Sequence, residues 1–123
     1  MKKITISSAG KSIEAMLYET ETAETLYKSL PIEGTVSMWG DEIFFKIPIN
    51  IELASDAQEY VEIGELAYFP QSPALCIFFG QTPASTDERP KANSPVNIFG
   101  MVLEGLEKLN DIQEGDNIIV SKN

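Results

Sequence analysis

The side chains that most often catalyse reactions are scarce in this sequence of 123 residues. It contains no histidine, one cysteine (Cys76) and one arginine (Arg89). A nucleophilic cysteine needs a basic partner, usually histidine, and a lone cysteine can form no disulfide within the chain. Zinc sites also depend mainly on cysteine and histidine. We therefore expect no metal and no cofactor, and we expect Cys76 to behave as a small buried apolar side chain.

Carboxylates are in excess, with 19 Asp and Glu against 9 Lys and Arg. Close pairs such as Asp41–Glu42, or Glu62 with Glu65, contain the groups that acid–base catalysis requires. A further group of oxygen-bearing residues comprises Asn110, Asp111, Glu114 and Asp116. Its spacing does not match an EF-hand loop, and turns are rich in these residue types. With so many acids, close pairs arise by chance, and the sequence distinguishes none of them.

Aromatic side chains point to a different chemistry, the binding of an apolar ligand. We expect a groove formed by Trp39, Phe45, Tyr68 and Phe79, with Lys46 and Gln81 as polar contacts. Ligand pockets are usually apolar and contain a few well-placed polar groups. Trp39 lies beside Gly40 in a predicted turn, so we expect it to be the most exposed ring. The alternative is that most of these rings pack in the core, where aromatic side chains dominate burial.

The net charge of −10 restricts the partners of the protein. Binding along a nucleic acid requires clustered Lys and Arg, and negative charge opposes binding to anionic lipid surfaces. Residues 1–14 (MKKITISSAGKSIE) have no apolar segment behind their lysines, so we expect no signal peptide and a cytoplasmic location. We therefore predict a peptide or small-molecule ligand, no nucleic-acid partner and no membrane partner. The sequence leaves open a homodimer.

The elements that would position these side chains are mostly short strands. Period-two alternation or short apolar runs predict strands at residues 2–7, 12–18, 35–39, 43–48, 49–53, 60–63, 66–69, 74–79, 96–103 and 116–121. Pro48 and Gly64 mark bulges or breaks, so we count about eight strands. Residues 22–30 predict a helix, because Ala23, Leu26 and Leu30 recur with helical spacing. A short helix is expected around residues 103–109.

Residues 64–83 (GELAYFPQSPALCIFFGQTP) form the centre of the predicted fold. The longest apolar run, residues 74–79, lies between turn residues and predicts a strand buried on both faces. The following residues 80–95 contain three prolines and predict a loop of a length that is often functional. Residues 1–123 fit a single domain. We predict a mainly β fold, a closed antiparallel eight-stranded barrel whose helices cover its ends, because closure removes exposed strand edges.

Several segments in this order resemble the cyclophilins. TETAETLYKSL (residues 20–30) is similar to the first helix of that family, CIFFG (76–80) to its Gln-Phe-Phe strand, and NIFGMVLEGLEKLNDI (97–112) to its Val-Phe-Gly strand with the following turn and helix. GDEIFFKIP (40–48), AYFPQSPALCIFFGQTP (67–83) and PVNIFG (95–100) together resemble small prokaryotic cyclophilin-like proteins whose activity is not established. The resemblance implies an eight-stranded barrel capped by helices, and prolyl cis/trans isomerisation as the family's activity.

Cyclophilins bind proline in an apolar pocket beneath an arginine, with a histidine and a tryptophan in the groove. By this resemblance Phe79 falls on the pocket phenylalanine, and Phe78 on a neighbour that should face the core. Ile77 stands in place of the family's glutamine, and no residue can match the histidine. In residues 36–48, where the arginine should lie, Lys46 is the only cation. Arg89 on the long loop is the alternative donor.

Three functions are compatible with these observations. The first is a module that binds a proline-containing peptide or a small neutral ligand in the aromatic groove without turnover. The second is a peptidyl-prolyl isomerase in which Lys46, Gln81 or Arg89 supplies the donor. The third is an unrelated small-molecule enzyme on the same barrel, since a fold does not determine a function.

Overall fold

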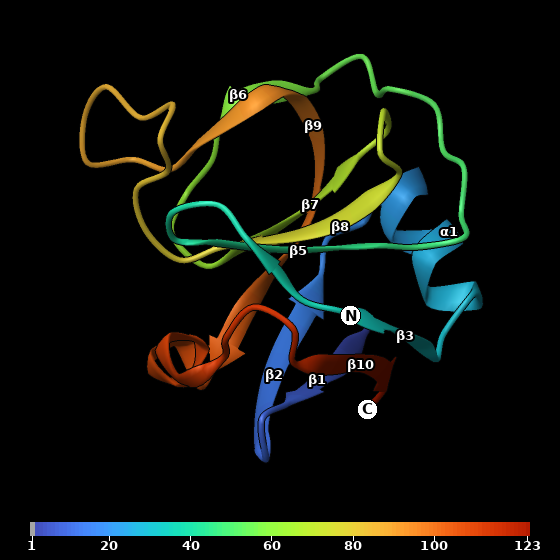
Figure 1. The fold of residues 1–123 in the computed structure, drawn as a ribbon. Helices are drawn as coiled ribbons and strands as arrows, with labels where there is room; N and C mark the ends of the chain where they lie inside the picture. The colour runs from blue at the N-terminus through green and yellow to red at the C-terminus, as the bar shows by residue number, and fades with distance from the viewer. Residues whose placement is uncertain (1) are drawn as a thin grey trace.

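The computed structural model describes residues 2–123 and shows a mainly β protein with two short helices (Figure 1). The elements in chain order are β1 (Lys3–Ser8), β2 (Lys11–Leu17), α1 (Glu21–Lys28), β3 (Ile32–Thr35), β4 (Ser37–Met38), β5 (Glu42–Lys46), β6 (Gln58–Tyr60), β7 (Glu65–Phe69), β8 (Ala74–Phe78), β9 (Lys91–Glu104), the 3-10 helix η1 (Leu106–Asp111) and β10 (Asn117–Lys122). The strands pair antiparallel in the order β3-β10-β1-β2-β9-β7-β8-β5-β4, and β6 pairs with β9.

The two strands at the ends of this order are consecutive in the chain. β3 pairs with β10, and β4 pairs with β5. In the chain, only Val36 separates β3 from β4. Within residues 2–123, no hydrogen-bonded ladder joins β3 directly to β4. The sheet has ten strands instead of the eight predicted. The prediction of a closed barrel is therefore confirmed only as a mainly β, antiparallel fold with two helices.

The central strand β8 is buried on both faces, as its apolar run predicts. Leu75 and Ile77 point into the larger apolar cluster, whereas Ala74, Cys76 and Phe78 belong to a smaller cluster on the opposite face. This division follows from the strand period of two, which sends successive side chains to opposite faces of a sheet. Two separate apolar clusters therefore share the sheet formed by β5, β7, β8 and β9.

The helix α1 forms where the apolar stripe predicts it, from Glu21 to Lys28. The Thr20 side chain accepts a hydrogen bond from the backbone N–H of Ala23 at 3.0 Å, which satisfies one of the free donors at the helix start. Ala23 and Leu26 are buried in the larger cluster. The predicted short C-terminal helix is present as η1.

The predicted strand at residues 49–53 is wrong, because this segment pairs with side chains and not with a neighbouring strand. The Tyr68 hydroxyl donates to the Ile49 carbonyl at 2.8 Å and accepts from the Ile51 N–H at 2.9 Å. The buried Asn97 side chain accepts from the Ala54 N–H at 2.8 Å. Alternating apolar residues had suggested a strand, but these side-chain contacts meet the backbone's hydrogen-bonding needs without a ladder.

The strand β9 is longer than predicted and shortens the preceding loop. It begins at Lys91 where the sequence suggested residue 96, so the segment between β8 and β9 spans residues 79–90. Figure 1 shows β9 running from its pairing with β6, past β7, toward β2. It continues through Gly100, where a Cβ atom would lie 2.5 Å from the Met16 carbonyl. The predicted strand at residues 60–63 is also displaced, since β6 ends at Tyr60.

Candidate functional site

The candidate site is built on the tight turn between β4 and β5. The Trp39 N–H donates to the Glu42 carbonyl at 3.0 Å, and the Glu42 N–H donates to the Trp39 carbonyl at 3.2 Å. Gly40, with φ of +60°, and Asp41 form the two-residue turn between them. Residues that face each other in such a pair carry their side chains on the same side of the sheet. The turn therefore places the Trp39 ring beside the Glu42 carboxyl group.

The chain after β8 packs on this turn and holds it in place. The Phe79 N–H donates to the Asp41 carbonyl, and the Asp41 N–H donates to the Gln81 carbonyl, both at 2.9 Å. A Cβ atom on Gly40 would come within 2.9 Å of the Gln81 carbonyl oxygen. Both the positive φ and this close approach require glycine in the turn.

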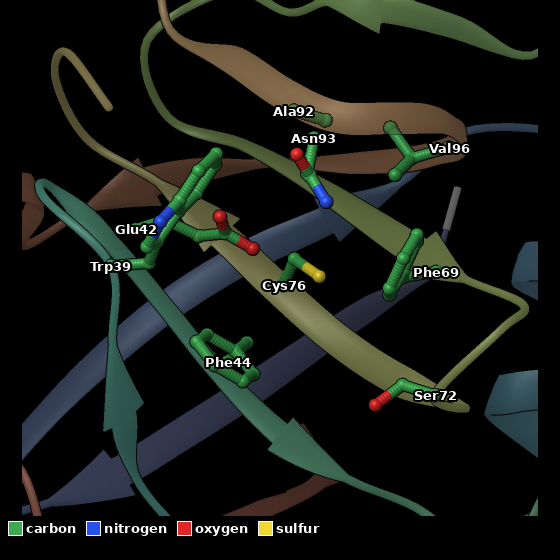
Figure 2. A pocket seen from close by; sticks show the side chains of 9 residues that line it. All are labelled: Trp39, Glu42, Phe44, Phe69, Ser72, Cys76, Ala92, Asn93 and Val96. Atoms are coloured by element: carbon green, nitrogen blue, oxygen red, sulfur yellow. The ribbon is translucent and has the colours of Figure 1, made fainter. Parts of the chain in front are cut away.

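The side chains of Trp39 and Glu42 open onto a pocket of about 280 Å³ on the outer face of β5, β7, β8 and β9. We call it the Glu42 pocket; its lining comprises Trp39, Glu42, Phe44, Phe69, Ser72, Cys76, Ala92, Asn93 and Val96. Strand register assembles it, because Phe44 on β5 lies opposite Cys76 on β8. Figure 2 shows the Glu42 carboxyl group between the Trp39 ring and the Cys76 thiol, with the Asn93 amide above and Phe44 and Phe69 around the opening.

Glu42 is the unusual residue of this pocket. The residue is only 7% exposed to solvent. Among residues 2–123, its carboxyl group makes no ion pair within 4.0 Å. Burial raises the pKa of Glu42 to about 7, and the neighbouring Cys76 thiol opposes part of this rise. Burial, followed by the negative charge of Glu42, raises the pKa of Cys76.

These properties determine what the pocket can do chemically. Because the pKa of Cys76 is raised, its thiol stays protonated and is a poor nucleophile. Glu42 exchanges between an acid that donates a hydrogen bond and a carboxylate that accepts one near neutral pH. The aromatic and aliphatic lining provides apolar contact area. The pocket is therefore suited to bind a ligand through one polar or charged group and an apolar body.

The structure does not bring the four predicted groove rings together. Phe45 and Tyr68 are fully buried in the larger cluster, and Phe79 is half-buried and packs against the same cluster. Only Trp39 lines the Glu42 pocket. Phe78, expected to face the core, is fully buried, and the cluster it belongs to is the smaller one on the pocket side. Whether these residues contact a ligand stays a prediction.

The three candidate donors are not in the pocket lining either. Lys46 is exposed on the same face of β5 as Glu42, about 13 Å away along the strand. The Gln81 side chain donates to the Asp87 carbonyl at 2.8 Å. Arg89 pairs with Asp87 at 2.7 Å and lies 4.1 Å from the centroid of the Tyr60 ring. Each of these side chains is exposed, and two of them are engaged within the 79–90 loop or its neighbour β6.

Two other carboxyl groups from the predicted acidic clusters make ordinary structural contacts. Glu65 accepts hydrogen bonds from the Tyr18 hydroxyl and from the Glu62 N–H, each at 2.8 Å. Glu114 accepts from the Met38 N–H at 3.0 Å. In the part of the chain that the structure describes, no three acidic or cysteine side chains are placed to hold a metal ion. No helix among residues 2–123 is long and apolar enough to cross a membrane.

Sequence reasoning missed most of this pocket. It considered Glu42 only as a member of one of several acid pairs, and it did not assign Phe44, Phe69 or Asn93 to a site. One signal was available: in EIFFK (residues 42–46), Glu42 and Phe44 share one face of the strand, opposite Phe45. The second signal was the spacing of Trp39 and Glu42, which lie on either side of the two turn residues Gly40 and Asp41. The contributions of β7 and β9 depend on register, which the sequence does not specify.

Comparison with known proteins finds one matching family model and a similar solved structure. A family model described as Cyclophilin-like matches residues 2–121. Among solved structures, the chain is similar to the solution structure of a hypothetical protein from Archaeoglobus fulgidus, with a TM-score of 0.84 and 32% sequence identity. That match covers 99% of this chain and 95% of the archaeal chain. A search of curated proteins finds no match.

Proposed function

We propose that this chain, which belongs to the cyclophilin-like family, binds a small, largely apolar ligand in the Glu42 pocket without turning it over. The prolyl ring of a peptide is one such ligand. The observation that carries the proposal is the pocket itself, with aromatic walls, one buried carboxyl group and a volume of about 280 Å³. Ligand sites are concave and mostly apolar with a few polar groups, and this volume suits a single ring with short substituents.

Binding is favoured over isomerisation because no cationic donor such as arginine lines the pocket among residues 2–123. An isomerase must lower a rotational barrier of about 18–20 kcal/mol that arises from amide resonance. The one arginine is paired with Asp87 on the loop, and neither Lys46 nor Gln81 is among the lining residues. The side-chain N–H donors that do line the pocket, the Trp39 indole and the Asn93 amide, are neutral.

Titration of the protein with Xaa-Pro peptides, followed by two-dimensional NMR, tests this proposal. We expect chemical-shift changes at the Trp39 indole N–H and at the backbone amides of Cys76 and Asn93. The variant Asn93→Trp places a large ring at the rim of the pocket and should abolish the changes. The matched variant Glu104→Trp, also at an exposed residue of β9 but outside the pocket lining, should retain them.

Two results would contradict the proposal. If peptides and small neutral ring compounds produce no shifts at about millimolar concentration, the pocket does not bind this class of ligand. If exchange cross-peaks between cis and trans peptide forms appear with catalytic amounts of protein, the protein is an isomerase. Uncatalysed exchange takes tens of seconds or longer, so catalysis would be plainly visible.

A further inference from the structure

We propose that the ligand of the Glu42 pocket carries an alkylammonium cation, which pairs with the Glu42 carboxylate while its apolar part contacts the surrounding rings. This inference rests on the proposed function, since it names the chemical class of the ligand bound there. It departs from the expectation of a neutral ligand that the sequence alone suggested. Three independent features of the pocket support it.

The first feature is a buried carboxyl group that lacks a positively charged partner among residues 2–123. Glu42 is more than nine-tenths buried and is directed into the cavity (Figure 2). Its carboxyl group has the Cys76 thiol as a hydrogen-bond partner, but among residues 2–123 no Lys or Arg pairs with it. Buried carboxylates in proteins are normally paired or neutralised, because an isolated buried charge is costly. A cation from outside the chain would supply the missing partner.

The second feature is the set of aromatic rings around this carboxyl group. Trp39, Phe44 and Phe69 line the pocket with it, and they come from three different strands or turns. Aromatic faces attract cations through their quadrupoles, and rings grouped around an acidic side chain suit quaternary and alkylated ammonium groups. A ligand that was only apolar would leave the carboxyl group without a role.

The third feature is the electrostatic setting. The chain has a net charge of −10, which raises the local concentration of cations near its surface. Two cations lie near the start of β9: Lys91 pairs with Glu59 at 3.7 Å and lies 5.4 Å from the centroid of the Tyr60 ring. Arg89 pairs with Asp87 at 2.7 Å and lies 4.1 Å from the same centroid. Both side chains therefore already have partners outside the pocket, which leaves the Glu42 position for an external cation.

Binding of such a cation should depend on pH through Glu42. The titratable group that faces Glu42 is the Cys76 thiol on β8, which stays protonated; the turn after β4 contributes Trp39 and β9 contributes Asn93, and neither of these titrates. A cation binds to the ionised carboxylate, so binding must release the proton that Glu42 carries at lower pH. The affinity should therefore rise with pH through the neutral range.

The test uses choline and its neutral isostere 3,3-dimethylbutan-1-ol, which differ in the charged nitrogen and not in shape. Choline keeps its charge at every pH, so any pH dependence of its affinity reports the protein. We expect choline to bind at least about tenfold more tightly than the alcohol at about pH 8. Its affinity should fall about tenfold by about pH 6, whereas that of the alcohol should not.

The variant Glu42→Gln keeps the shape of the side chain and removes its charge. It should bind the two probes equally and show no pH dependence. The control Glu33→Gln, which removes an exposed carboxylate on β3, should behave like the natural protein. The pH profile of the natural protein is a second readout that does not depend on the folding of any variant.

The possible failures are distinguishable. If the natural protein binds both probes equally, or binds the alcohol more tightly, the pocket is a ligand site but its ligand does not carry the proposed alkylammonium cation. If choline does not bind while Xaa-Pro peptides shift the Trp39 indole signal, the proposed function stands and this inference falls. If neither the peptides nor the probes bind, both proposals are overturned.

Discussion

Replacing Glu42 by glutamine should change how the stability of the protein depends on pH. Glu42 is buried beside Trp39 and Cys76, where its protonated form is favoured. In the unfolded chain the same carboxyl group is in water and ionises at its ordinary pKa. Between these two pKa values the native state holds a proton that the unfolded state has lost, so stability falls as the pH rises.

The size of this effect follows from the shift. The pKa rises from 4.5 to about 7 in the folded protein. One pKa unit corresponds to about 1.4 kcal/mol, so ionising Glu42 costs the native state about 3 kcal/mol. The cost is absent below the unfolded pKa, increases as the pH rises from about 4.5 to about 7, and is constant above that range. Glutamine cannot ionise, so the native state of the Glu42→Gln variant is not destabilised in this way.

Urea unfolding of the natural protein and Glu42→Gln, from about pH 4 to about pH 8, measures this difference. The free energy of unfolding of the variant, relative to the natural protein, should increase by about 3 kcal/mol across the range. All other carboxyl groups are shared and cancel in the comparison. Glu33→Gln controls for the loss of one negative charge at an exposed place. A difference between Glu42→Gln and the natural protein that stays constant with pH would refute the assignment of a buried, neutral Glu42.

Three further predictions concern the parts that support the site. Tyr68→Phe should lower the free energy of unfolding by about 1–3 kcal/mol and speed hydrogen exchange of the Ile51 amide, because two part-buried backbone groups lose their partner; unchanged exchange would contradict this. Gly100→Ala should destabilise by about 1–3 kcal/mol in urea unfolding, because its Cβ would meet the Met16 carbonyl at 2.5 Å; a neutral effect would show that β2 and β9 separate easily. Cys76 should react with iodoacetamide far more slowly in the native protein than in urea, because burial raises its pKa; equal rates would show that the thiol is accessible.

The resemblance to small prokaryotic cyclophilin-like proteins is confirmed, both by the family model over residues 2–121 and by the archaeal structure. Most of the strands were also predictable. Their residues alternate with period two or form short apolar runs, and this local pattern reflects the pleat of each strand. The segment at residues 49–53 has the same pattern but is not a strand. Its backbone pairs instead with the side chain of Tyr68, which lies in a distant part of the sequence.

The site was less predictable than the fold. Trp39 was correctly expected in a turn, and it lines the pocket. Phe45 and Tyr68 were assigned to the groove from their type alone, but their faces of β5 and β7 point into the larger cluster. A shift of one residue along a strand exchanges the two faces of the sheet. Ring type therefore says little about whether a ring lines a pocket or a core.

The sequence by itself determined the acidic charge, the absence of histidine, the strand-rich fold and the family, because each is local or compositional. Only the tertiary structure decided which carboxylate is unusual. Glu42 resembles the other acids in the sequence, and its properties arise where β5 pairs with β8, so that Cys76 lies beside its carboxyl group in place of water. The desolvation that raises its pKa comes from neighbours distant in the chain, and no local pattern can encode it.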